Sequence, residues 1–245
     1  MENDASGATL LNLGCGYKTT DAEGVVNIDF GVFLRIATTP ILRNAAPFIV
    51  GRGRVEKLRQ LSANIMVYDL SRGIPAADNS IEAVYHSHML EHLDRDVAVN
   101  FMQEVARVLR PGGIHRIAVP DLEYSVRRYI EHLDSDDRSE LHDPYIGALL
   151  EQSVRREAAG TSTQSRWRRV LENLILGDAR KRGETHQWMY DSKSLSELLS
   201  RTGFTNVRRY RFGESGIPNW TDYGLEFDES GGEYKPHSLY LEAMA

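Results

Sequence analysis

The sequence is poor in three features that would point to other classes of protein. Cys15 is the only cysteine among the 245 residues, which excludes an intrachain disulfide. No apolar stretch approaches the roughly 20 residues of a membrane-spanning helix, and the polar, acidic residues 1–4 do not resemble a signal peptide. Acidic residues outnumber basic ones, 35 to 29, which argues against a generally basic surface for nucleic acid. We therefore expect a soluble, cytoplasmic protein without a nucleic-acid or membrane partner.

Short apolar runs alternate with helical patterns along the chain. A helical stripe over residues 97–109 ends at Pro111-Gly112-Gly113. Such alternation is typical of a doubly wound, Rossmann-like α/β sheet, mostly parallel with an antiparallel edge strand. A chain of this length, with 41% hydrophobic residues, suits one domain. The seven expected strands are residues 10–13, 25–29, 64–69, 81–86, 114–119, 206–212 and 238–244, the last two as a hairpin.

Residues 122–183 interrupt this alternation. They are charged, helical in pattern and contain no obvious strand. We therefore predict that about residues 122–183 form an inserted helical cap over the substrate, within the single domain.

Glycines and acidic residues follow the first three expected strands. Gly14-Cys15-Gly16 ends the first strand, Asp29 the second and Asp69 the third. Sheets of this type bind ligands at the carboxyl ends of their strands, where glycine lets a ligand approach the backbone. A carboxylate at Asp29 suits the hydroxyls of a ribose. Because Thr19 occupies the third glycine position of the dinucleotide motif, a nucleoside without phosphates is favoured over a dinucleotide.

Several blocks of the sequence resemble, in order, the motifs of small bacterial class I methyltransferases that use S-adenosylmethionine (SAM). These blocks are residues 11–16, 27–29, 87–93 and 107–113. Residues 119–123 and 186–191 narrow the resemblance to a subgroup associated with glycan and natural-product pathways. The resemblance implies SAM as cofactor, with cofactor-binding residues Gly14, Cys15, Gly16, Asp29, Asp69, Leu70, His86, Ser87 and His88.

The chemistry of methyl transfer directs attention to bases near the expected cofactor site. A hydroxyl acceptor must lose a proton, and a positioned base typically contributes about 10²–10⁴-fold to the rate. His92 and Glu91 follow the fourth expected strand, and Asp121 ends the fifth. His186 lies in an aromatic segment that the resemblance places over the acceptor. We therefore predict His186, His92, Glu91 and Asp121 as catalytic candidates, with His186 as the leading base.

The motif His88-x-x-Glu91-His92 also raises the question of a metal. It matches an inverted zinc-protease motif, but its place in a cofactor-binding α/β unit excludes a protease. Plant small-RNA 2′-O-methyltransferases use a similar Glu-x-x-Glu-His helix and a later His to hold a divalent cation, whereas here His88 replaces the first Glu. We assign no metal ligand, and a divalent cation on these residues and His186 stays a minor hypothesis.

The sequence as a whole predicts a SAM-dependent O-methyltransferase with a histidine base, acting on a hydroxyl of a sugar, glycan or glycosylated metabolite. Two alternatives stay open. One is N-methylation of a small amine or peptide, and the other is a non-catalytic SAM-binding module that partners another enzyme. The expected partners are a small-molecule or oligosaccharide acceptor and, if the protein self-associates, a second copy in a homodimer.

Overall fold

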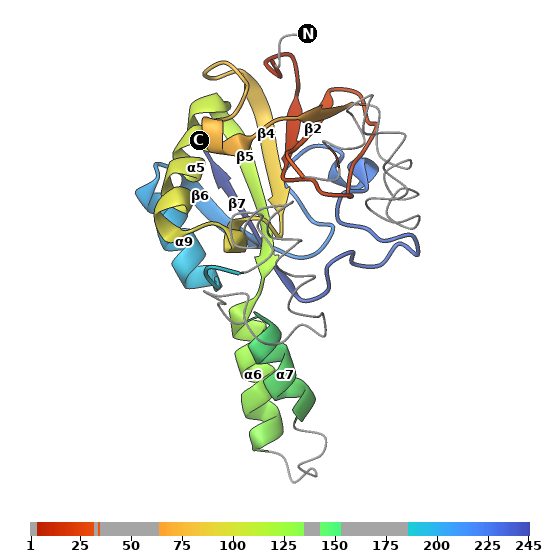
Figure 1. Cartoon of the computed structure of the whole chain (residues 1–245), viewed down its shortest axis with the longest axis vertical. Helices are drawn as coiled ribbons and strands as arrows, with labels where there is room; N and C mark the ends of the chain where they lie inside the picture. The colour runs from red at the N-terminus through yellow and green to blue at the C-terminus, as the bar shows by residue number, and fades with distance from the viewer. Residues whose placement is uncertain (1–3, 32–33, 35–63, 135–142, 153–185) are drawn as a thin grey trace, which may run out of the picture.

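The computed structural model describes residues 4–31, 34, 64–134, 143–152 and 186–245, and a seven-stranded sheet forms its centre (Figure 1). The sheet order is β3-β2-β1-β4-β5-β7-β6. Strands β1 to β5 pair in parallel, whereas β7 runs antiparallel to both β5 and β6. The strands are β1 (Leu10–Leu13), β2 (Val25–Asp29), β3 (Ile65–Val67), β4 (Ile81–Ser87), β5 (Leu109–Pro120), β6 (Thr205–Tyr210) and β7 (Ser238–Met244).

This order confirms the Rossmann-like, mostly parallel sheet with antiparallel pairing at one end. The last two strands do pair antiparallel, as expected. The strand that runs against the others is β7, and it lies one place in from the edge because β6 takes the outermost position.

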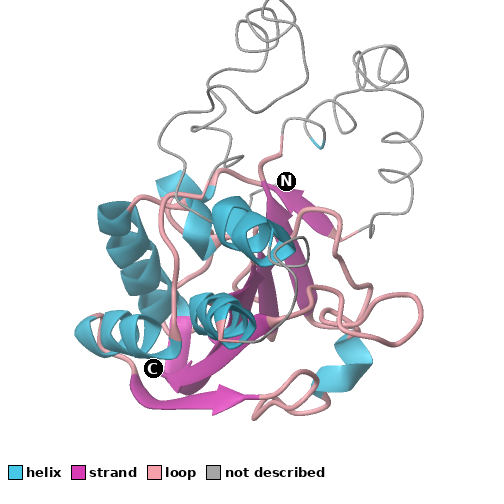
Figure 2. Cartoon of the chain, turned by 90° about the horizontal axis from the view of Figure 1, so that it is seen from below, coloured by secondary structure: helices cyan, strands magenta, loops and turns pink. Residues whose placement is uncertain are grey.

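Helices and a long loop cover the two faces of the sheet. Apolar side chains of α5 and α9 pack on one face, and the segment that contains Ile217, Trp220 and Leu225 packs on the other. Figure 2 shows helices gathered on one side of the sheet. No described helix is long and apolar enough to cross a membrane. The helical elements are η1 (Leu70–Arg72), η2 (Leu90–His92), α5 (Arg95–Val108), α6 (Leu122–Leu133), α7 (Asp143–Gln152), α9 (Ser192–Arg201) and η4 (Trp220–Tyr223).

Strand β5 begins earlier than the sequence predicts. The helix does end before Pro111, at Val108, but the Pro-Gly-Gly turn then forms part of β5, which starts at Leu109 and not at residue 114. A side chain at Gly113 would place its Cβ 3.0 Å from the backbone oxygen of Glu82 in β4. Glycine therefore lets the two backbones meet at this point, where the register between the strands shifts.

The expected cap is helical where the structure describes it. Helix α6 follows β5 directly, so it leaves the sheet at the carboxyl end of a central strand, and α7 packs against it. The two helices extend away from the body of the molecule (Figure 1). Residues 135–142 and 153–183 of the expected cap lie outside the described residues.

Candidate active site

The turn after β1 combines two glycines in left-handed conformation. Gly14 has φ +60° and Gly16 has φ +55°, a region that disfavours residues with a Cβ. A Cβ at Gly14 would lie 2.5 Å from Sδ of Met89, whereas one at Gly16 would meet nothing within 4 Å. Gly14 thus allows close packing beneath the turn, and Gly16 leaves its outer side open.

Asp29 lies against this turn. Its Oδ2 accepts a hydrogen bond from the backbone N–H of Gly16 at 2.8 Å, and its Oδ1 accepts one from Gly31. The backbone N–H of Tyr68 donates to the carbonyl of Asp29 at 3.0 Å, which brings the end of β3 alongside. Asp69 follows and caps η1 by accepting from Ser71 N–H at 3.0 Å. The two predicted carboxylates therefore follow neighbouring strands at one edge of the sheet.

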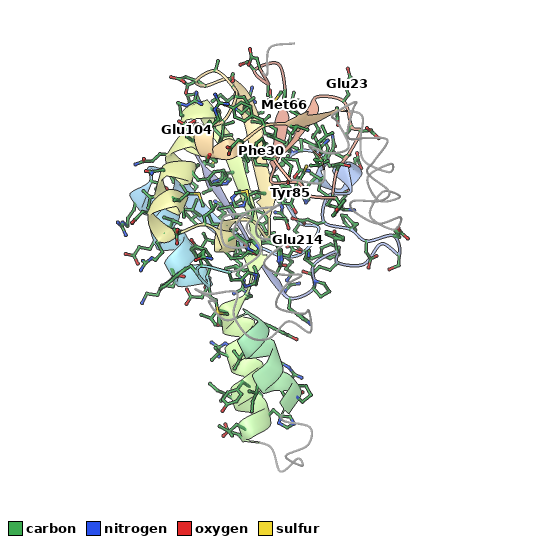
Figure 3. The ribbon with its side chains drawn as sticks, in the orientation of Figure 1. Glu23, Phe30, Met66, Tyr85, Glu104 and Glu214 are labelled. Carbon is green, nitrogen blue, oxygen red and sulfur yellow. The ribbon has the colours of Figure 1, made fainter. Side chains whose placement is uncertain are left out.

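A cavity of about 220 Å³ opens beside the glycine turn. Residues that end β1 and β4 line one side of it, and residues from the loop before β7 line the other. Figure 3 labels Tyr85, one of the β4 residues in its wall. The lining residues are Asn12, Gly14, Cys15, Gly16, Tyr17, Lys18, Tyr85, Ser87, His88, Tyr234 and Lys235. Of the predicted cofactor residues, Gly14, Cys15, Gly16, Ser87 and His88 line this cavity, and Asp29, Asp69, Leu70 and His86 do not.

The side chain of His86 does not face this cavity, so any part it takes in cofactor binding would come from its backbone. Neighbouring residues of a strand point to opposite faces, and Tyr85 takes the cavity side. The His86 ring is fully buried, 5.3 Å from the ring centre of Phe101 and 5.1 Å from that of His115. Burial lowers the pKa of His86 to about 3, so this imidazole is a neutral core side chain.

Cys15 is a buried residue of the turn. Burial, together with the charge of Asp29, raises the pKa of its thiol well above the usual range. A protonated thiol is a weak nucleophile, so Cys15 contributes backbone and packing to the turn.

Next to the cavity lies a group of four side chains that we call the histidine cluster: His88, Glu91, His92 and His186. Oε1 of Glu91 lies 3.5 Å from Nδ1 of His88 and 3.8 Å from Nε2 of His92. The rings of His92 and His186 meet edge to face, with centres 4.8 Å apart. The structure therefore brings together three of the four predicted catalytic residues.

The backbone of the cluster differs from the expected helix start. Residues Leu90–His92 form a single 3-10 turn, α5 begins only at Arg95, and His88 has φ +49°. The distant His186 reaches the cluster because the N–H groups of Gln187 and Trp188 both donate to the carbonyl of Glu91, at 2.7 and 3.2 Å. These backbone bonds place a segment from far along the chain beside the turn.

His88 connects the cluster to the cavity. Its ring lines the cavity wall, and its Nε2 lies 2.8 Å from Oγ of Ser238 at the start of β7. Burial, aided by the charges of Lys235, His186 and His92, lowers the pKa of His88 to about 3. The His88 imidazole is therefore neutral at physiological pH.

Glu91 is the most buried member of the cluster, with a side chain 2% exposed. Burial raises its pKa to about 8. Among the described residues, none forms a hydrogen bond with either of its carboxylate oxygens. Glu91 is therefore largely protonated at neutral pH, and its burial keeps it from direct contact with a substrate.

Asp121, the fourth candidate base, makes structural contacts outside the histidine cluster. Its Oδ1 caps α6 by accepting from the N–H groups of Glu123 and Tyr124, and its Oδ2 accepts from Nη2 of Arg209 at 2.8 Å. The side chain is 4% exposed. A buried carboxylate with these three partners holds the end of β5, the start of α6 and strand β6 together.

Comparison with known proteins links part of this chain to one protein family. Residues 46–117 match the family model described as a methyltransferase domain. This match covers less than a third of the chain. A search of curated proteins found no match.

Solved structures of SAM-dependent methyltransferases align with this chain over nearly its whole length. One from Archaeoglobus fulgidus is 12% identical with a TM-score of 0.43, and the alignment covers 98% of this chain and 87% of the other. One from Methanosarcina mazei is 18% identical with a TM-score of 0.44, covering 96% and 91%. One from Aquifex aeolicus is 15% identical with a TM-score of 0.40, covering 97% and 82%. At these identities the resemblance concerns the fold and says nothing about the acceptor.

Sequence reasoning missed the residues that close the cavity from the far side. Lys18 donates to the carbonyl of Phe227 at 2.6 Å, and its ammonium lies 5.1 Å from the ring centre of Tyr234. Lys235 follows Tyr234 and also lines the cavity. These contacts join positions more than 200 residues apart, and no local motif marks them.

Proposed function

We propose that this protein is a SAM-dependent methyltransferase that transfers the methyl group to a hydroxyl of a sugar, glycan or glycosylated metabolite. SAM supplies an activated methyl group, so an amine acceptor needs little further help, whereas a hydroxyl needs a base. The observation that carries the proposal is the contact of the histidine cluster with the cavity through His88. A group of imidazoles at this place suits proton removal.

In this proposal the cofactor lies along the glycine turn. The open side of Gly16 and the adjacent carboxylate of Asp29 fit a nucleoside whose ribose hydroxyls bond to that carboxylate. Asp69 and Leu70 would lie beside the adenine. The methionine end would lie at the turn, with Ser87 and His88 near the sulfonium.

The imidazole of His186 is the proposed base. Glu91 is protonated and buried, and Asp121 is held by its three partners. His92 and His186 are both partly exposed. His186 belongs to the segment that follows the expected cap, so it comes from the acceptor side of the site. Its lone pair would accept the hydroxyl proton as the oxygen attacks the methyl carbon.

Helices α6 and α7 are the described part of the proposed acceptor cap, within a single domain. The ring of Tyr124 in α6 stacks on His237, with centres 4.2 Å apart and planes 10° apart. This contact joins α6 to the loop that carries Tyr234 and Lys235 into the cavity wall. Aromatic rings that line such a cleft would suit the apolar faces of a sugar.

The acceptor class can be tested with isotopically labelled SAM and matched acceptors. We expect transfer to free and lipid- or peptide-linked sugars and glycosides, with mass spectrometry locating the label in a methyl ether. Amino sugars with every hydroxyl blocked serve as the control and should stay unlabelled. Label found only on nitrogen would contradict the proposal and favour the N-methyltransferase. SAM binding without turnover on any acceptor would favour the non-catalytic module.

Replacing Asp29 with alanine should cripple cofactor binding. Its carboxylate would make charge-assisted hydrogen bonds with the ribose, each contributing about 1.5–3 kcal/mol. Since about 1.4 kcal/mol is a factor of ten, Asp29→Ala should weaken SAM binding more than tenfold in calorimetry. Asp29→Asn keeps an oxygen for Gly16 N–H and separates loss of charge from loosening of the turn.

The exposed Asp78, which pairs with Arg107 away from the cavity, provides the matched control for that measurement. Asp78→Ala should bind SAM as the wild type does. If folded Asp29→Ala binds SAM with wild-type affinity, Asp29 is not the ribose ligand.

A further inference from the structure

The burial of the Glu91 carboxyl group requires a compensating interaction. Its side chain is 2% exposed, and within the described part of the chain neither oxygen has a hydrogen-bond partner. A buried polar group without such a partner costs free energy that native proteins rarely leave uncompensated. The neighbours that surround this carboxylate are imidazoles, at 3.5 Å for His88 and 3.8 Å for His92.

Three of these side chains have the spacing of a metal centre. One ligand atom each from Glu91, His92 and His186 lies within 4.8 Å of the other two. In a tetrahedral site with ligands about 2.0–2.2 Å from the ion, ligand atoms lie about 3.4 Å apart. Each side chain would therefore move by about 1 Å, which small χ rotations provide.

The donor set indicates which ion would fit. Two imidazole nitrogens and one carboxylate oxygen suit zinc and its neighbours, whereas magnesium and calcium prefer sites made of oxygen alone. A site with three protein ligands leaves a fourth position open, as catalytic zinc sites do.

We propose that Glu91, His92 and His186 bind one divalent transition-metal ion, with an open position toward the acceptor. The backbone already fixes this arrangement, because Gln187 and Trp188 bond to the carbonyl of Glu91 and hold His186 in place. The proposed set leaves out His88, whose Nε2 is engaged with Ser238 and whose Nδ1 lies 3.5 Å from Oε1 of Glu91.

The role of this ion rests on the proposed function, but its binding does not. A bound cation lowers the pKa of an oxygen ligand at its open position. The ion would thus take the place of the His186 imidazole in the activation of the hydroxyl, with the proton passing to solvent. With the ion bound, His186 would be a metal ligand. Without the ion, His186 would be the general base.

The test uses the full chain, freed of metal by a chelator and titrated with Zn²⁺ in a calorimeter. Co²⁺ absorption spectra report the coordination of a spectroscopic substitute. We expect one ion per chain. His92→Ala and His186→Ala should each weaken binding by about 100-fold or more, because even the outer partners of metal ligands are worth 10–100-fold. Glu91→Gln keeps the shape of the buried side chain and should also lose binding.

His132 in α6 provides the control, because it contacts Tyr145 and lies outside the cluster. His132→Ala should bind the ion as the wild type does. Absence of stoichiometric Zn²⁺ and Co²⁺ binding, or wild-type binding by His186→Ala, would overturn the site. Ion binding without methyl transfer to any hydroxyl would support the site and contradict the proposed function. Methyl transfer to a hydroxyl by a chain that binds no ion would support the proposed function and contradict the metal site.

Discussion

His186→Ala should lower kcat by about 10²–10⁴-fold, the usual contribution of a positioned base. The affinity for SAM should hardly change, because His186 does not line the cavity beside the glycine turn. A loss in kcat with unchanged cofactor binding indicates an interaction that stabilises the transition state. The measurement is steady-state kinetics with the methylated hydroxyl acceptor, together with SAM calorimetry on the same variant. The wild-type rate should also fall at acid pH, since a protonated imidazole has no lone pair to accept a proton.

Two comparisons decide how this result is interpreted. His132→Ala removes an imidazole outside the cluster and should leave kcat unchanged. The wild-type rate after chelation distinguishes two roles of His186. A general base keeps its effect without an ion, whereas a metal ligand loses it. If His186→Ala keeps near-wild-type kcat across the pH range, His186 is neither, and His92 becomes the candidate base.

The parallel half of the fold could be predicted because its signals are local. Buried strands of a parallel sheet are short apolar runs, and each ends where a glycine or an acidic residue meets the ligand edge. Strands β1 and β2 match their predicted bounds at both ends, and so does the antiparallel strand β7. The start of β5 was predicted five residues late because Pro111 and two glycines are typical of a turn. Only the neighbouring backbone of Glu82 explains why the strand continues through them.

The candidate site could be predicted only in part, because side-chain direction depends on packing. The strand position of His86 was predicted correctly, but the alternation of β4 turns its ring into the core. Asp121 follows a central strand, where a catalytic base would lie. Its partner Arg209 is 88 residues away, so the sequence does not show the pairing. The approach of His186 to Glu91 rests on backbone hydrogen bonds that leave no mark in the sequence.

Arg116 shows the same limit most clearly, since nothing in the strand pattern marks it as the centre of a buried network. Its guanidinium is fully buried, and it donates to both carboxylate oxygens of Glu226 at 2.7 and 2.8 Å. A third bond, at 2.7 Å, goes to Glu242 of β7. The ring centre of Trp220 lies 4.8 Å from the guanidinium carbon. The network holds the loop before β7 on one face of the sheet.

Arg116→Met should destabilise the protein by about 3–5 kcal/mol, because it leaves two buried carboxylates without their cation. For a chain of this length that corresponds to a fall in Tm of roughly 6–20 °C. SAM binding should weaken as well, since Tyr234 N–H donates to the carbonyl of Glu226 and the loop forms part of the cavity wall. Thermal and denaturant unfolding measure the first effect, and calorimetry on the folded variant measures the second.

Arg110 offers the matched control on the same strand. It pairs with Glu82 at 2.7 Å, but both side chains are about half exposed, and pairs of that kind contribute about 0–1 kcal/mol. Arg110→Ala should therefore hardly change Tm. The triple variant R116M/E226Q/E242Q removes the buried charges together and should recover much of the stability that R116M loses. If R116M unfolds at the wild-type temperature, or if the triple variant is less stable than R116M, uncompensated charge is not what the arginine prevents. In the second case, the packing of the arginine against Trp220 would be the contribution to measure.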